Sequence, residues 1–169
     1  FSSKWLASGQ IPERAVDEGY IGWFGAIDPS EGGKTSRVNA NAVMTTYLKD
    51  GARLKNQLFY THYEFELYSN FTFFLEDPVN GDEIKQKENR NMFGYNGSYN
   101  RKDNWGNLPI QTEVGIYARQ DLTKDSELSH TKSRELLEHI MLGDVYETNL
   151  AVYAFQNYAF TDKFRVTLG

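Results

Sequence analysis

Apolar and polar positions alternate with a period of two along most of this chain, and this pattern predicts β-strands. In the clearest run, 110–120, Ile110, Val114 and Ile116 fall on one face, whereas Glu113 and Arg119 fall on the other. The same alternation is found in four further segments, 37–48, 59–67, 87–99 and 146–160, and the residues 163–169 are interpreted as the start of another strand. The pattern therefore predicts an all-β chain of about six strands.

One segment also fits a helix. In 132–142, the residues Leu136, Leu137, Ile140 and Met141 lie three to four positions apart, which is helical spacing. Short apolar runs fit either element, so strand and helix both stay open for this segment.

The predicted connections alternate in length. The links at 49–51, 102–108 and 161–163 are short, whereas those at 70–85 and 121–134 are long and polar. In an antiparallel up-and-down meander, every second connection lies at the same end of the sheet. Outer-membrane barrels have this asymmetry, with short turns on the periplasmic side and long extracellular loops.

The composition is typical of a β-sheet that has lipid on one face and water on the other. The chain holds 11 Phe, 11 Tyr and 3 Trp, yet its mean hydropathy is −0.61. A membrane barrel strand needs apolar residues on only one face, and aromatic residues collect at its two interfaces. A soluble β-sandwich or β-barrel that binds an apolar ligand or a glycan remains the alternative, and it predicts that the large aromatic residues are buried.

Charge and residue types exclude several classes. The absence of Cys rules out disulfides, thiolate zinc sites and thiol nucleophiles. The formal charge of −5 argues against nucleic-acid binding, which needs a basic surface.

Specific strings resemble the barrel of TonB-dependent outer-membrane receptors. The most specific is FELYSNFTFFLEDPVNGD at 65–82, which resembles a strand tip and extracellular loop of that family. Three other stretches are similar to family segments: ASGQIPERAVDEGYIGWFGAIDPSEGGKTSR at 7–37, EVGIYARQD at 113–121, and the pair 148–153 and 161–169.

This resemblance implies a plugged transmembrane barrel of 22 strands in the outer membrane of a Gram-negative bacterium. The 169 residues are then expected to be a partial arc of that barrel, without the plug domain and the remaining strands. The implied function is active uptake of a scarce, bulky nutrient, with a ferric siderophore as the commonest cargo. The implied partners are the plug domain, the TonB complex, outer-membrane lipid and the transported ligand. No enzymatic activity and no cofactor are expected.

Two sets of candidate residues follow. Loop residues expected to bind ligand or form the aromatic rim are Trp23, Phe24, Tyr68, Phe71, Phe73, Phe74, Asp77, Asn80 and Asp82. Charged residues expected to face the lumen are Arg37, Glu64, Glu66, Glu88, Arg90, Glu113 and Arg119.

Three further patterns are weighed and set aside. The string EGGKT at 31–35 looks like part of a phosphate-binding loop, but Asp28 replaces the first glycine, so a polar loop is favoured. Oxygen ligands at 77–83 lack the spacing of a calcium loop. His62, His130 and His139 lie far apart in the sequence and lack metal-ligand spacing.

Overall fold

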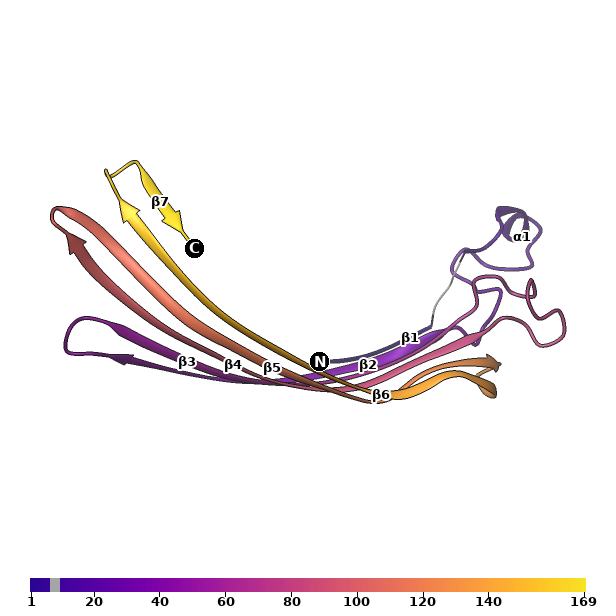
Figure 1. Ribbon diagram of the computed structural model, residues 1–169. Coiled ribbons are helices and arrows are strands. Elements are labelled where there is room, and N and C mark those ends of the chain that lie inside the picture. The colour runs from indigo at the N-terminus through magenta and orange to yellow at the C-terminus, as the bar shows by residue number, and fades with distance from the viewer. Residues whose placement is uncertain (7–9) are drawn as a thin grey trace. The chain divides into compact units, whose positions relative to one another are not determined.

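The computed structural model, which describes residues 1–6 and 10–169, is an antiparallel up-and-down β-sheet with almost no helix (Figure 1). Seven strands follow one another in the sheet in chain order. Their bounds are β1 Ser2–Leu6, β2 Gly32–Tyr47, β3 Arg53–Ser69, β4 Ile84–Trp105, β5 Leu108–Lys132, β6 Glu135–Ala159 and β7 Arg165–Leu168, with the short helix α1 at Glu13–Asp17. The predicted all-β meander is therefore confirmed.

Each predicted strand overlaps an observed one, and the observed strands are longer except β7, which has four residues where the prediction spans 163–169. β4 and β5 run over 22 and 25 residues, because their pairing continues through polar stretches that carry no apolar alternation. β1 is an additional strand that the sequence pattern did not predict, and it pairs with the start of β2 from Ser2 opposite Ser36 to Leu6 opposite Gly32.

The predicted long loop at 121–134 is wrong, because β5 continues to Lys132 and a two-residue turn leads directly into β6. This turn, Ser133-Arg134, places two non-glycine residues at positive φ, 51° and 68°. Hairpin turns of this kind favour Asn and Gly, so the sequence carries no signal for it. The buried positions near the end of β5 are also polar, Ser129 and Thr131, which hides the strand from a hydrophobicity pattern.

The helix considered for 132–142 is also wrong, because these residues form the end of β5, the turn and the start of β6. The polar loop predicted at 31–35 is wrong, since β2 begins at Gly32. A nucleotide-binding loop would require a helix after Lys34, and the strand at that position removes this possibility.

The contacts divide the chain into two units. Unit 1 comprises 1–38, 62–91 and 122–145, and unit 2 comprises 39–61, 92–121 and 146–169. Unit 2 holds the short connections, including the predicted turn at Lys49-Asp50-Gly51, where Gly51 adopts a φ of 80°. Unit 1 holds the segment before β2, the loop at 70–83 and the two-residue turn before β6. The predicted sorting of short and long connections thus fails only at 121–134.

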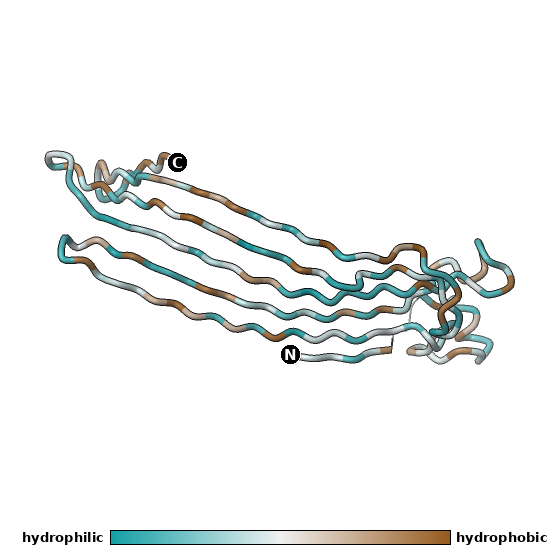
Figure 2. The backbone as a smooth tube through the Cα atoms, turned by 60° about the horizontal axis from the view of Figure 1, so that its bottom comes forward, coloured by the Kyte–Doolittle hydropathy of each residue, from teal (hydrophilic) through white to brown (hydrophobic). Residues whose placement is uncertain are grey.

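The pattern of burial is inverted relative to a soluble domain. Among the described residues, the only buried hydrophobic side chain is Ala52, whereas ten polar or charged residues are buried. Every strand carries at least one exposed large apolar side chain, and brown and teal positions interleave along the strands (Figure 2). In a water-soluble domain the apolar side chains would occupy the interior.

Candidate functional site

Unit 2 has one apolar face. The rings of Tyr60 and Phe93 lie across β3 and β4 with their centroids 5.0 Å apart. An open hollow of about 690 Å³ extends over this face. Its apolar lining comprises Ala40, Ala42, Leu58, Tyr60, Phe93, Tyr95, Ala118 and Leu150. These side chains come from five neighbouring strands, and no other part of unit 2 covers them.

The opposite face of unit 2 carries hydrogen-bonded polar side chains. Glu113 on β5 accepts hydrogen bonds from Nδ2 of Asn100, at 2.9 Å, and from the hydroxyl of Tyr153, at 3.0 Å. Arg119, which lies on the same face because it is six residues along the strand, forms a two-point pair with buried Asp121. Arg119 is therefore neutralised by a carboxylate of the same strand, and Glu113 is hydrogen-bonded by two neutral side chains.

Two glycines let aromatic rings lie flat on the sheet of unit 2. A Cβ at Gly115 would lie 2.4 Å from Cζ of Tyr153, and a Cβ at Gly94 would lie 2.0 Å from Cζ of Phe59. Both distances are far below van der Waals contact. The two glycines thus provide the space in which Tyr153 and Phe59 pack on the strands.

In unit 1 the residues expected to line a lumen do not share one face. Lys34 pairs with Glu66 at 3.3 Å, and Ser36 donates a hydrogen bond to Glu64 at 3.2 Å. Residue 37 is next in the strand, so its side chain points to the other face, where the guanidinium of Arg37 lies 5.7 Å from the ring centroid of Tyr63. The assignment of Arg37 and the two glutamates to one common face is therefore wrong.

The remaining two residues of this set, Glu88 and Arg90, form an ion pair on β4. Nδ1 of His62 and Oδ1 of Asn91 are 3.0 Å apart across β3 and β4, so these two residues lie on the face of Glu64. Arg90 precedes Asn91 and consequently lies on the face of Arg37. The apolar positions of β3 explain the error, because Tyr63 lies on the face of Arg37, whereas the apolar positions of β2, such as Val38, lie on the other face.

The loop at 70–83 is held by its own polar side chains. The carboxylate of Asp82 accepts hydrogen bonds from the backbone N–H groups of Leu75, Glu76 and Asp77, at 2.7 to 3.2 Å. Together with the hydroxyl of Thr72, which has the largest effect, these donors lower the pKa of Asp82 to about 2. The carboxylates expected to contact ligand are therefore engaged by the loop itself.

Asp77 has a similar role in the second half of this loop. Its Oδ1 accepts hydrogen bonds from the backbone N–H groups of Val79 and Asn80, both at 2.9 Å, and Oδ2 accepts one from the Asn80 side chain at 3.0 Å. The pKa of Asp77 is lowered mainly by the Asn80 backbone N–H. Asp77 and Asn80 thus shape the turn that Gly81 completes at a φ of 86°.

The aromatic candidates are accessible instead. Trp23, Phe24, Phe71 and Phe74 are exposed, and Phe24 is 96% exposed. Phe73 and Tyr68 are half-buried, and Phe73 adopts a positive φ of 60°. Of the predicted loop set, the rings are therefore the groups that are free to touch another molecule.

A buried polar cluster in unit 1 was not predicted. Glu83 is 1% exposed, and it bonds to Ser30, Thr131 and Arg134. Nearby, Asp28 accepts a hydrogen bond from Nδ2 of Asn70 at 2.9 Å. Burial raises the pKa of Asp28, but the hydrogen bonds from Asn70 and Ser30 outweigh this effect, so the pKa is lowered. No local sequence pattern predicts this cluster, because its members lie up to 104 positions apart.

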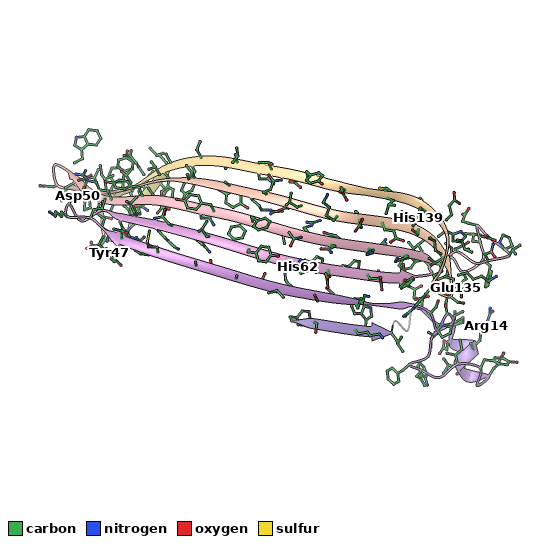
Figure 3. The ribbon with its side chains drawn as sticks, turned by 90° about the horizontal axis from the view of Figure 1, so that it is seen from below. Arg14, Tyr47, Asp50, His62, Glu135 and His139 are labelled. Atoms are coloured by element: carbon green, nitrogen blue, oxygen red, sulfur yellow. The ribbon has the colours of Figure 1, made fainter. Side chains whose placement is uncertain are left out.

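The histidines and acidic residues do not form a metal site. His139 on β6 contacts the hydroxyl of Ser129 through Nδ1 at 2.9 Å, and His130 contacts the Gly81 carbonyl through Nε2 at 2.6 Å; Figure 3 labels His62 and His139 on their strands. Within residues 1–6 and 10–169, no group of three or more such side chains is placed to hold a metal ion.

Comparisons with known proteins give no assignment: no family model, no curated protein and no solved structure matches the chain. Nor does any helix in the described part of the chain have the length and apolar character needed to cross a membrane.

Proposed function

We propose that this chain is part of the wall of a transmembrane β-barrel in the outer membrane of a Gram-negative bacterium. In this proposal the barrel is a TonB-dependent receptor that imports a ferric siderophore. The observation that carries the proposal is the uncovered apolar face of unit 2, backed by a polar face on the same strands. A barrel wall has this distribution, with apolar side chains toward lipid and polar side chains toward the interior.

The hydrogen bonds on the polar face support the interior assignment. Glu113 and Arg119 are both paired with neighbours in the sheet, as charged groups must be where access to bulk water is limited. In the proposed receptor this face contacts the plug domain, which receives energy through the TonB complex. The chain supplies no catalytic groups in this mechanism, because uptake moves the ligand without changing its bonds.

Ligand capture is assigned to the loops of unit 1. The exposed rings of Trp23, Phe24, Phe71 and Phe74 offer apolar contact area, while the carboxylates of Asp77 and Asp82 fix the loop that carries two of these rings. The same rings suit an interfacial girdle. Uptake measurements on ring variants separate the two roles, because a girdle residue affects insertion rather than ligand affinity.

A soluble β-sandwich or β-barrel that binds an apolar ligand is the second candidate. It requires large apolar side chains to lie on a covered face, whereas Val152 is 82% exposed and Leu150 is exposed beside it. The burial pattern therefore favours the membrane wall over the soluble module.

Fractionation tests the proposal directly. The protein as its gene encodes it is produced in a Gram-negative host, and inner membrane, outer membrane and soluble fractions are separated by density. The proposal expects the protein in the outer membrane, extractable only with detergent. Recovery of folded protein in the soluble fraction without detergent would refute it and favour the soluble module.

A further inference from the structure

Three connections of unit 1 meet at one buried carboxylate. Both oxygens of Glu83, the residue before β4, are used: Oε2 bonds to the Ser30 hydroxyl, and Oε1 accepts hydrogen bonds from the Thr131 hydroxyl and the Arg134 backbone N–H, both at 2.7 Å. The Glu83 carbonyl also accepts the Thr131 N–H at 2.8 Å. One side chain thus links the segment before β2, the loop before β4 and the turn before β6.

Arg134 strengthens this link from the turn. Its Nε donates a hydrogen bond to the Ser30 carbonyl at 2.7 Å, and its guanidinium lies 5.1 Å from the ring centroid of Tyr68. The residue adopts a φ of 68°, which disfavours any side chain with a Cβ. A strained backbone position is kept where the side chain makes contacts that offset the strain.

We propose that Glu83 and Arg134 form a clasp that holds the segment 10–31 and the loop 70–83 as one fixed surface. The clasp joins residues 104 positions apart in the sequence, so local structure alone cannot supply the constraint. It is a positioning device, because Arg134 acts on the segment through its hydrogen bond to Ser30.

The clasp has a consequence for ligand recognition, which rests on the proposed function. Phe24 is carried by the segment 10–31 and Phe71 by the loop 70–83, and both rings are exposed. Fixing both segments before binding avoids the entropy cost of ordering them with the ligand. The rings are then a preformed surface rather than a pair of closing lids.

A matched pair of glycine variants tests the clasp. Arg134→Gly removes the guanidinium and relieves the strain of a positive φ, so the turn itself is expected to form at least as well. Ser133→Gly relieves the same kind of strain at φ 51° without removing a clasp side chain. Amide hydrogen exchange of the full protein in detergent reports the opening of each segment.

The expected result is about a tenfold faster exchange across 10–31 in Arg134→Gly, with exchange in Ser133→Gly within about twofold of wild type. Unchanged exchange across 10–31 in Arg134→Gly would overturn the clasp, as would equal acceleration in both variants. Glu83→Gln provides a second measurement, because an amide keeps an acceptor for the Arg134 N–H while the Ser30 hydroxyl can accept from it. Accelerated exchange in Glu83→Gln assigns the constraint to the charge, whereas exchange as slow as wild type assigns it to the hydrogen bonds.

Uptake distinguishes a failure of the clasp from a failure of the proposed function. With a ferric trihydroxamate as probe, Arg134→Gly is expected to raise the apparent KM and leave the maximal uptake rate unchanged, since the rings lose only their positioning. A raised KM in Ser133→Gly as well would overturn the positioning role. If wild type takes up no ferric chelate, the proposed function fails, while the exchange result still decides the clasp.

Discussion

Glu113 and Val114 are neighbours in β5, yet their side chains lie on opposite faces with opposite surroundings. Glu113 is bonded to Asn100 and Tyr153, whereas Val114 is exposed on the apolar face. Because strand residues alternate, this one step in the sequence separates the proposed aqueous and lipid sides of the wall.

The first prediction uses this pair. Val114→Arg is expected to reduce the amount of folded protein in the outer membrane, because Arg on the lipid face costs about 2–4 kcal/mol at the bilayer midplane. Glu113→Arg loses two hydrogen bonds but stays on the polar face, so its loss is expected to be smaller. Quantification of both proteins in outer-membrane fractions is the measurement, and Gln111→Arg is a control on the polar face. Equal yields for Val114→Arg and Gln111→Arg would contradict the facing.

The second prediction concerns Gly115. Gly115→Ala places a Cβ against Tyr153, so the ring must move and its hydrogen bond to Glu113 is expected to break. Overpacking of this kind costs about 1–3 kcal/mol in the free energy of unfolding, measured by denaturant titration in detergent. Gly143→Ala is the control, since a Cβ there meets nothing within 4 Å. A similar free energy of unfolding for both variants would show that the Tyr153 ring does not depend on Gly115.

The third prediction is a pH dependence of the loop at 70–83. The lowered pKa of Asp82 means that its ionised form stabilises the folded loop; this stabilisation is fully present above the ordinary value of 3.8 and is lost as pH falls through about 2. Amide exchange of Leu75, Glu76 and Asp77, corrected for intrinsic rates, is expected to accelerate between pH 4 and 2 relative to a reference strand.

Asp82→Asn is the control for this titration, because it removes the ionisable group. In this variant the amides of Leu75, Glu76 and Asp77 are expected to exchange faster at pH 6 and to lose the part of their pH dependence below 4 that Asp82 causes. A wild-type loop whose corrected exchange is constant down to pH 2 would contradict the role assigned to Asp82.

The fourth prediction separates ligand contact from interfacial anchoring. Phe24→Ser changes a side chain that is 96% exposed, so the yield of folded protein is expected to stay within about twofold of wild type. Uptake of the ferric probe is expected to show a raised KM. Val79→Ser is the control, since Val79 is also exposed but is not aromatic and lies on the loop 70–83. A loss of outer-membrane yield without a change in KM would assign Phe24 to the girdle instead.

Much of the strand architecture could be predicted from alternation, and the exceptions share a cause. At 121–134 the buried positions are polar, Asp121, Thr123, Ser129 and Thr131, so the strand carries no apolar face to detect. The turn at Ser133-Arg134 lacks Gly and Asn, because distant contacts of Arg134 hold a conformation that local preference disfavours. Both failures reflect tertiary interactions that override local signals.

The sequence by itself determined the all-β meander, the short turn at Gly51 and the position of the long polar loop at 70–83, because periodicity and turn chemistry are local. Only the tertiary structure decided which strand faces coincide, since a shift of one residue in pairing reverses every side chain. It therefore placed Arg37 opposite to Glu64 and brought Glu83, Ser30 and Arg134 together. Such relationships depend on cross-strand register and on contacts between distant segments, which a single sequence does not encode in any local pattern.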